Sequence, residues 1–172
     1  MNVMRNLRIE KVTLNIGAGK DQSKLEKGVL LLKEITGVNP VKTFTQKRIP
    51  EWGLRPGLAI GCKITLRKKK ADEILERFLE AKDKVLSENQ FDSNGNLSFG
   101  IAEYIDIPGV KYDPKIGIMG LQICVTIERP GFRIKRRFSK TVQIHPRHKV
   151  TKSEAIEFIK NKFKVTIKSG EE

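Results

Sequence analysis

The sequence predicts an α+β fold, in which an antiparallel sheet of mixed strand order carries helices on one face and leaves the other face open. Three segments alternate apolar and polar residues as half-buried strands do: Leu7–Gly17, Ile60–Arg67 and Leu121–Glu128. Two further segments repeat apolar residues at helical spacing. We expect a single domain over residues 1–172, because 172 residues are enough to bury one well-formed core.

The charge of the chain indicates the kind of partner that it binds. Lys and Arg number 34 against 20 Asp and Glu, and the formal net charge of +14 favours a polyanionic partner. Hydrophobic residues make up 38% of the chain, which excludes wholesale disorder, and no apolar run approaches the roughly 20 residues of a membrane span. The amino terminus carries no recognisable secretory signal. We therefore expect a folded cytoplasmic protein that does not contact a membrane.

The first predicted strand, Leu7–Gly17, has one polar and one apolar face. Alternation places on the polar face Ile9, Lys11, Thr13 and Asn15, and on the apolar face Val12, Leu14 and Ile16. The strand ends in Gly17–Lys20, which is similar to half of a phosphate loop but lacks the Ser or Thr after the Lys. The alternative is a tight strand-to-helix turn, which can still present backbone N–H groups to an RNA phosphate.

Two amphipathic helices are predicted on the same face of the sheet. Ser23 and Glu26 fit a capping box for a helix that runs to about Ile35 and is ended by Gly37. The segment Ala71–Asn89 repeats apolar residues on one side and predicts the second helix. Each helix has a single apolar stripe, so both should pack on the apolar sheet face and leave the opposite face uncovered.

The stretch Thr36–Arg67 joins two predicted strands, Val41–Thr45 and Ile60–Arg67, through a basic loop that holds the only Trp. In the second strand, alternation turns Cys62, Ile64 and Leu66 inward and Lys63, Thr65 and Arg67 outward. The outward side chains of both strands are cations, hydroxyls and an amide without a carboxylate, which suits the phosphates and ribose hydroxyls of RNA. The alternative, an ordinary solvated face, is common for a single strand, but here two strands agree.

The second half of the chain predicts further strands and a basic arm. Phe91–Gly100 reads as a turn and a returning strand, and the segment from Pro108 to Gly120 as a loop. Arg129–Lys152 contains nine Lys or Arg and no acid, with apolar anchors between them, which predicts a basic arm at about 129–150 lying on RNA. The alternative is a solvated hairpin. Thr151 and Glu154 then cap a helix through about Phe163, and Val165–Lys168 predicts a last strand.

Signals for an enzyme are weak throughout the sequence. His145 and His148 lie three apart, but Pro146 breaks the helix that would align them, so we predict no metal site and no cofactor. No Ser or Cys lies in a recognisable nucleophile motif. Cys62 and Cys124 lie inside predicted strands without metal-ligand spacing, and we expect both to be small buried hydrophobic residues.

Short motifs over nearly the whole chain point to one family. They are KVTLNIG at residues 11–17, ITG and PVKT within 35–43, LRPG at 54–57, IGCKITLR at 60–67, SFGI at 98–101 and YD at 112–113. In this order they resemble the family of large-subunit ribosomal proteins numbered five, which anchors 5S ribosomal RNA. ERPG at 128–131 and TKSEAI at 151–156 are similar to its archaeal and eukaryotic branch.

The resemblance implies a structural constituent of the large ribosomal subunit that is not an enzyme. Such a protein would bind 5S rRNA and attach it to 23S-type rRNA in the central protuberance. It would also form an intersubunit bridge to a small-subunit head protein and approach P-site tRNA. The implied location is the ribosome in the cytoplasm.

Carried onto this sequence, the resemblance implies roles for particular residues. The 5S rRNA-binding residues would be Lys11, Thr13, Asn15, Thr43, Thr45, Lys47, Arg48, Lys63, Thr65 and Arg67. The loop near tRNA would include Trp52, Arg55 and Gly57. The bridge would involve Tyr112, Asp113 and Lys115. The basic arm would add rRNA contacts through Arg133, Lys135, Arg136 and Arg137.

Overall fold

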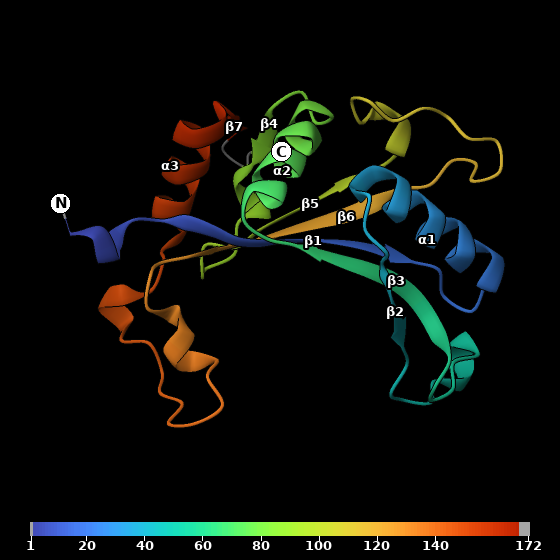
Figure 1. Cartoon of the computed structure of the whole chain (residues 1–172), viewed down its shortest axis with the longest axis horizontal. Coiled ribbons are helices and arrows are strands. Elements are labelled where there is room, and N and C mark those ends of the chain that lie inside the picture. Colours follow the sequence, from blue (N-terminus) through green and yellow to red (C-terminus); the bar gives the residue numbers. More distant parts are fainter. Residues whose placement is uncertain (1, 169–172) are drawn as a thin grey trace.

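Five strands form one antiparallel sheet in the computed structural model, which describes residues 2–168. The strands are β1 (Arg8–Gly17), β2 (Val41–Phe44), β3 (Ala59–Leu66), β5 (Leu97–Ile101) and β6 (Leu121–Glu128). Their order across the sheet is β2-β3-β1-β6-β5, so the first strand of the chain lies at the centre (Figure 1). This arrangement confirms the predicted α+β class with an antiparallel sheet of mixed order.

Within residues 2–168, helices cover only one face of this sheet. The helices α1 (Gln22–Thr36) and α2 (Lys69–Glu80) lie side by side above it, and α3 (Lys152–Phe163) follows near one end (Figure 1). Short 3-10 helices punctuate the loops at Val3–Arg5, Pro50–Trp52, Glu88–Gln90, Tyr104–Asp106, Phe132–Lys135 and Pro146–His148. The predicted one-sided layering is therefore confirmed.

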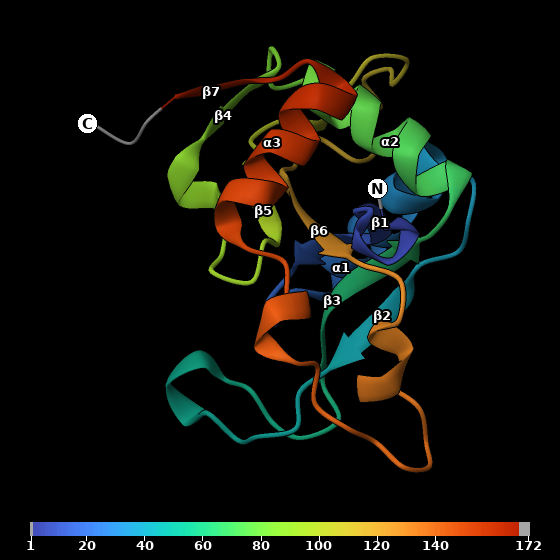
Figure 2. The same ribbon diagram turned by 90° about the vertical axis from the view of Figure 1, so that its left-hand side faces the viewer.

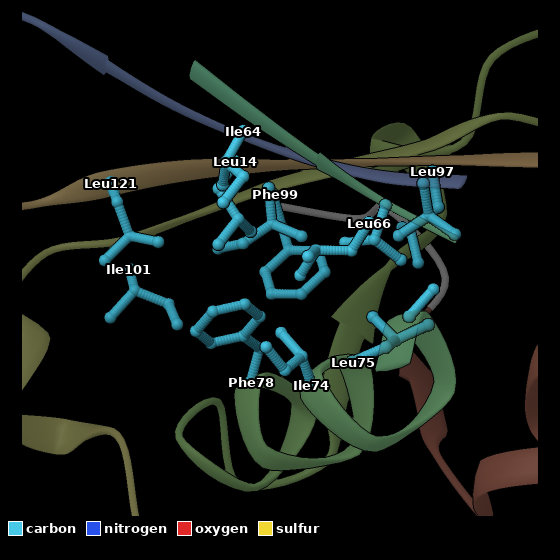
Figure 3. Close-up of a cluster of buried hydrophobic side chains, with 14 of the residues drawn as sticks. Leu14, Ile64, Leu66, Ile74, Leu75, Phe78, Leu97, Phe99, Ile101 and Leu121 are labelled. Carbon is cyan, nitrogen blue, oxygen red and sulfur yellow. The ribbon is translucent and has the colours of Figure 1, made fainter. Parts of the chain in front are cut away.

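The core fills the space between the sheet and the helices. Leu14 of β1 and Ile64 and Leu66 of β3 point toward Ile74 and Phe78 of α2, and all five side chains are buried (Figure 3). Gly28 lets α1 approach closely, because a Cβ atom there would lie 3.1 Å from the Cys62 Sγ. Burial of this apolar layer contributes most of the stabilisation, at about 25 cal/mol per Å². The polar positions of the same strands are left on the other face.

The ends of the helices differ partly from the predictions. Asp21 begins α1, since its carboxylate accepts hydrogen bonds from the N–H groups of Ser23 and Lys24, so the predicted Ser23–Glu26 capping box is wrong. These hydrogen bonds, led by that of Lys24, lower the pKa of Asp21. Gly37 ends α1 with a φ of 67°, as predicted. The predicted capping box of α3, formed by Thr151 and Glu154, is confirmed.

The second helix is shorter than predicted, and a small second sheet replaces its last part. Helix α2 ends at Glu80, and Asp83 and Lys84 adopt left-handed φ values of 55° and 56°. The chain then forms β4 (Val85–Ser87), which pairs in parallel with β7 (Thr166–Lys168). The apolar Val85 and Leu86 continue the helical spacing, so the pattern alone could not reveal this break.

Candidate nucleic-acid interface

The open face of the sheet carries the predicted polar side chains in register. Asn15 lies opposite Lys63, and Thr13 lies opposite Thr65, across the β1–β3 pair. Lys63 and Thr65 are exposed, and Lys11, Thr13 and Asn15 are partly exposed. The predicted orientation of these five residues is confirmed, and their contact with RNA stays a prediction.

Two more strands extend this open face. Cys124 and Gln122 of β6 lie opposite Thr13 and Asn15 of β1, while Ser98 of β5 lies opposite Cys124. The expectation that Cys124 is buried is therefore wrong, because it occupies an outward position of its strand. Cys62 is buried as expected, and burial raises the pKa of its thiol. The exposure of Cys124 agrees with the alternation of Leu121–Glu128, which places this residue on the outward face of the strand.

Two basic segments project on the same side as the open face. They are the loop between β2 and β3 and the arm between β6 and α3 (Figure 1). Figure 2 shows them again below the sheet, with the loop at one side and the arm at the other. Helices α1 and α2 lie on the opposite side of the sheet. The exposed sheet surface is thus flanked by cationic chain at both ends.

The β2–β3 loop is closed by its own backbone hydrogen bonds. The N–H of Thr45 donates to the Leu58 carbonyl at 2.9 Å, and Ile49 and Leu54 exchange hydrogen bonds of 3.0 Å. Within the loop, Leu54 is buried, whereas the Trp52 side chain is 66% exposed. Exposed cationic side chains follow the same loop: Lys47, Arg48 and Arg55. The loop therefore presents an aromatic ring and cations on an ordered backbone.

Thr45, one of the predicted RNA-contacting residues, has an internal role. Thr45 is buried, and its hydroxyl donates to the Leu58 carbonyl at 3.2 Å, so its expected position on the RNA-facing surface is wrong. Thr43 is only partly exposed and lies against Gly61. Gly57 has a φ of 83°, which a residue with a side chain rarely adopts.

The basic arm folds against one end of the sheet. Phe132 is buried, and the Lys135 ammonium lies 5.2 Å from the centre of its ring. Arg136 forms ion pairs with Glu10 and Glu128, while the Arg137 Nε donates to the Lys140 carbonyl at 2.7 Å. Arg133 is exposed. The arm is thus an ordered segment with two 3-10 turns, at Phe132–Lys135 and Pro146–His148.

A β-bulge introduces an acid that the predicted open face lacks. Ile9 pairs with Ile127 and Lys11 with Thr126, so Glu10 is an extra residue between them. Ile9 consequently packs against the core, and its predicted outward orientation is wrong. The Glu10 carboxylate accepts a hydrogen bond of 3.1 Å from Arg67, one of the predicted RNA contacts. The face is cationic, but it is not free of carboxylates.

Neither of the weaker ligand signals is supported by geometry. The N–H groups of Ala18 and Gly19 both donate to the Ile60 carbonyl, at 2.9 and 3.0 Å, so the turn at Gly17–Lys20 does not offer them to a phosphate. His145 Nδ1 accepts from the Arg147 N–H, and His148 Nε2 lies 2.9 Å from the Pro130 carbonyl. Within residues 2–168, no group of three or more His, Cys, Asp or Glu side chains is placed to hold a metal.

The predicted bridge residues lie on the other side of the molecule. The chain between β5 and β6 rises on the side of α1 and α2 (Figures 1 and 2). The Asp113 N–H donates to the buried Tyr104 hydroxyl at 3.0 Å, and its carboxylate accepts from the Lys115 N–H at 2.9 Å. Tyr112 is exposed. Tyr112, Asp113 and Lys115 thus form a surface separate from the open sheet face.

The open sheet face carries exposed cations and lies between two basic segments. No helix within residues 2–168 has the length and apolar character of a membrane span. Residues 2–55 match the family described as ribosomal protein L5, and residues 59–158 match the model for the C-terminus of the same ribosomal family. The chain belongs to the ribosomal protein L5 family, which confirms the resemblance seen in its motifs.

Archaeal relatives named "Large ribosomal subunit protein uL5" are similar over nearly the full length. The protein of Sulfurisphaera tokodaii is 50% identical over 171 residues, covering 99% of this chain and 97% of its own. That of Sulfolobus acidocaldarius is 48% identical over 169 residues, covering 98% and 95%. That of Nanoarchaeum equitans is 48% identical over 165 residues, covering 95% and 97%. Since these relatives are named ribosomal proteins, the prediction that the chain is not an enzyme is confirmed.

Proposed function

We propose that this protein is a structural constituent of the large ribosomal subunit that binds 5S rRNA through its open sheet face. In this role it attaches 5S rRNA to the 23S-type rRNA of the central protuberance. Membership of the ribosomal protein L5 family supports a place in the large subunit. The single observation that supports RNA binding is the bare cationic sheet face with basic segments at both ends.

The chemistry of the face fits a folded RNA better than a small ligand. Lys11 and Lys63 supply charge for backbone phosphates, while Thr13, Thr65 and Asn15 supply hydrogen-bonding groups at a fixed height above the sheet. The wide, shallow minor groove of an RNA helix displays 2′-hydroxyls and phosphates to such a surface. Lys47, Arg48 and Thr43 extend the same contact toward the β2–β3 loop.

The arm supplies an additional contact with rRNA. Arg133, Lys135, Arg136 and Arg137 lie within one short segment, and Phe132 anchors that segment to the sheet. An anchored cationic segment presents its charges without the ordering cost of a free tail. The whole chain then acts as one RNA-binding domain with a basic arm.

The remaining partners are assigned to opposite sides of the molecule. The β2–β3 loop, with Trp52, Arg55 and Gly57 near its tip, approaches P-site tRNA on the side of the open face. Tyr112, Asp113 and Lys115 contact a small-subunit head protein on the helix side. Because these two surfaces do not overlap, the protein can hold 5S rRNA and still meet both partners.

Hydroxyl-radical footprinting of 5S rRNA with the purified protein tests the main proposal. The expected result is one protected region at about micromolar protein or below in physiological salt, with no protection of an unrelated RNA duplex of equal length. Equal protection of both RNAs would reduce the interaction to non-specific charge. Absence of any protection at these concentrations would contradict 5S rRNA binding.

A further inference from the structure

Five charged side chains form an alternating row at the end of the sheet where the arm docks. Arg8 donates to Glu128 at 2.7 Å, Glu128 pairs with Arg136, Arg136 pairs with Glu10, and Glu10 accepts from Arg67 at 3.1 Å. The row thus joins β1, β6, the arm and the residue that follows β3. Each of the two carboxylates holds two guanidinium groups.

The anions of this row are buried, and its cations are exposed. The Glu10 and Glu128 side chains are 7% and 5% exposed, whereas those of Arg8, Arg136 and Arg67 are 61%, 39% and 54% exposed. A buried carboxylate is costly unless it is paired, and here both are paired twice. The row therefore hides its negative charge inside the protein and presents three guanidinium groups to solvent.

The β-bulge of β1 creates this arrangement. With Ile9 paired to Ile127 and Lys11 to Thr126, Glu10 is the inserted residue, and its carboxylate reaches both Arg67 and the arm. Bulges commonly re-aim a side chain in this way. Without the extra residue, alternation would place residue 10 on the core face of the strand.

We propose that Arg8, Arg136 and Arg67 form a binding site for consecutive phosphates of an RNA backbone, and that Glu10 and Glu128 are the positioning residues that aim them. The inference rests on the proposed function of the open face. A guanidinium has five N–H donors, and each of these three arginines keeps donors beyond those that its carboxylate accepts. Arginines that a carboxylate already holds in place lose less side-chain freedom when they bind a phosphate in a bidentate manner.

The sign of one substitution separates this proposal from simple charge repulsion. If Glu10 only adds negative charge near RNA, Glu10→Gln removes repulsion and tightens binding. If Glu10 aims Arg67 and Arg136, the same substitution frees both guanidinium groups and weakens binding. We expect Glu10→Gln to weaken 5S rRNA binding about five- to tenfold, for two side chains that must be ordered on binding.

Glu51→Gln is the matched control for gel-shift titrations with 5S rRNA. Glu51 is exposed on the β2–β3 loop, on the same side as the open face, and no ion pair joins it to another described residue. Its substitution should leave the affinity unchanged or raise it by up to about twofold, because only a screened charge is lost. Affinity of Glu10→Gln equal to or above that of the unchanged protein would overturn the positioning role.

A double-mutant cycle with Arg136→Gln and protease digestion completes the test. If Glu10 acts through Arg136, most of the effect of Glu10→Gln on RNA affinity should vanish in the Arg136→Gln background, and full additivity would overturn the proposal. Without RNA, trypsin should cut residues 133–140 faster in Glu10→Gln than in Glu51→Gln. Equal cutting would overturn the arm-holding role. Failure of the unchanged protein to bind 5S rRNA would instead contradict the proposed function, and the digestion would still report on Glu10.

Discussion

Asn15 and Lys63 are register partners on the adjacent strands β1 and β3, at outward positions of the sheet face opposite α1 and α2. On the other side of β1, Asn15 pairs with Gln122 of β6, and the Asn15 Nδ2 donates to the Gln122 Oε1 at 3.4 Å. A cation therefore stands beside hydrogen-bonding groups at the middle of the open face.

Replacing Lys11 and Lys63 together with Ala should weaken 5S rRNA binding by about 2 kcal/mol, because two phosphate contacts are lost. The slope of log affinity against log salt should fall by about 2, since each Lys releases roughly one counterion equivalent. Gel shifts at several salt concentrations measure both quantities. The matched control is Lys33→Ala with Lys82→Ala, two exposed lysines in the last turn of α1 and just after α2. Equal weakening by both pairs would contradict a specific role for the sheet face.

Gly61→Ala should lower the free energy of unfolding by about 1–3 kcal/mol, the range for overpacking. An added Cβ would lie 2.7 Å from the Ile16 carbonyl and 3.1 Å from the Thr43 Oγ1, between three strands. Gly100→Ala on β5 is the control, because its Cβ would meet its nearest neighbour only at 3.9 Å. Urea unfolding of both variants checks this. Equal stability of the two variants would show that β3 shifts to admit the methyl group.

Thr45→Val should lower the stability by about 1 kcal/mol and leave 5S rRNA affinity unchanged, since it removes only the hydrogen bond to the Leu58 carbonyl. Thr65→Val should leave the stability unchanged and lower the 5S rRNA affinity, because Thr65 is exposed on the open face. Thermal unfolding and gel shifts on the same preparations separate the two effects. A loss of affinity in Thr45→Val without a loss of stability would return Thr45 to the RNA-contacting residues.

Glu154→Gln should destabilise the protein by about 1–2 kcal/mol at pH 7, a value reduced for the partial exposure of Glu154. Burial by itself raises the pKa of Glu154, but the hydrogen bonds from Thr151 and the charge of Arg129 outweigh it, so the pKa lies below its ordinary value of 4.5. A carboxylate with a lowered pKa contributes its full stability above the unfolded pKa and loses it as the pH falls through the folded pKa.

The stability difference between Glu154→Gln and the unchanged protein should therefore hold from pH 7 to about pH 5 and narrow below about pH 4.5. Gln still fits the capping box with Thr151, so the substitution removes chiefly the charge beside buried Arg129. Urea unfolding across this pH range provides the measurement, with Glu157→Gln on the same helix as the neutral control. A difference that widens toward low pH would refute the ion pair as its source.

Arg55→Ala should leave 5S rRNA affinity within about twofold, since Arg55 lies in the β2–β3 loop rather than on the sheet face. Its effect should appear as weaker P-site tRNA binding to ribosomes reconstituted with the variant. Filter binding of tRNA to joined subunits gives that readout. The control is Lys111→Ala, an exposed residue in the chain between β5 and β6, which lies on the side of α1 and α2. Loss of 5S rRNA affinity on its own, without a change in tRNA binding, would move Arg55 into the 5S contact.

The layered fold and its two faces could be predicted from the sequence because the strands alternate so regularly. Leu14 and Ile64 are buried, and Lys63 and Thr65 are exposed, as period two requires. The end of α2 could not be predicted, because Val85 and Leu86 fit a helix as well as a strand. The pairing of β4 with β7 makes this segment a strand and not a helix. The local sequence does not indicate that its partner is Thr166–Lys168.

The residue types of the candidate site could be predicted from the sequence, but the β-bulge and the ion pairs between distant residues could not. Alternation located Lys63 and Thr65 on the open face, yet one inserted residue, Glu10, changes the faces of its neighbours without altering the composition of the strand. The contact of Arg136 with Glu10 joins positions 126 apart in sequence. Such a pairing depends on where the arm docks, which charge counts do not specify. The burial of Thr45 could not be predicted, because its hydrogen-bond partner, the Leu58 carbonyl, lies across the loop.

The central position of β1 also has a consequence for how the chain matures during its own synthesis. Asn15 of β1 pairs with Gln122 of β6, which follows 107 residues later in the sequence. During synthesis, the edge of β1 that pairs with β6 therefore lacks its hydrogen-bond partners until most of the polypeptide has emerged. The parallel β4–β7 pair delays completion further, to the last described residues. A nascent form with β1 and β3 joined but β6 still missing would expose an unprotected strand edge, which can pair with another chain.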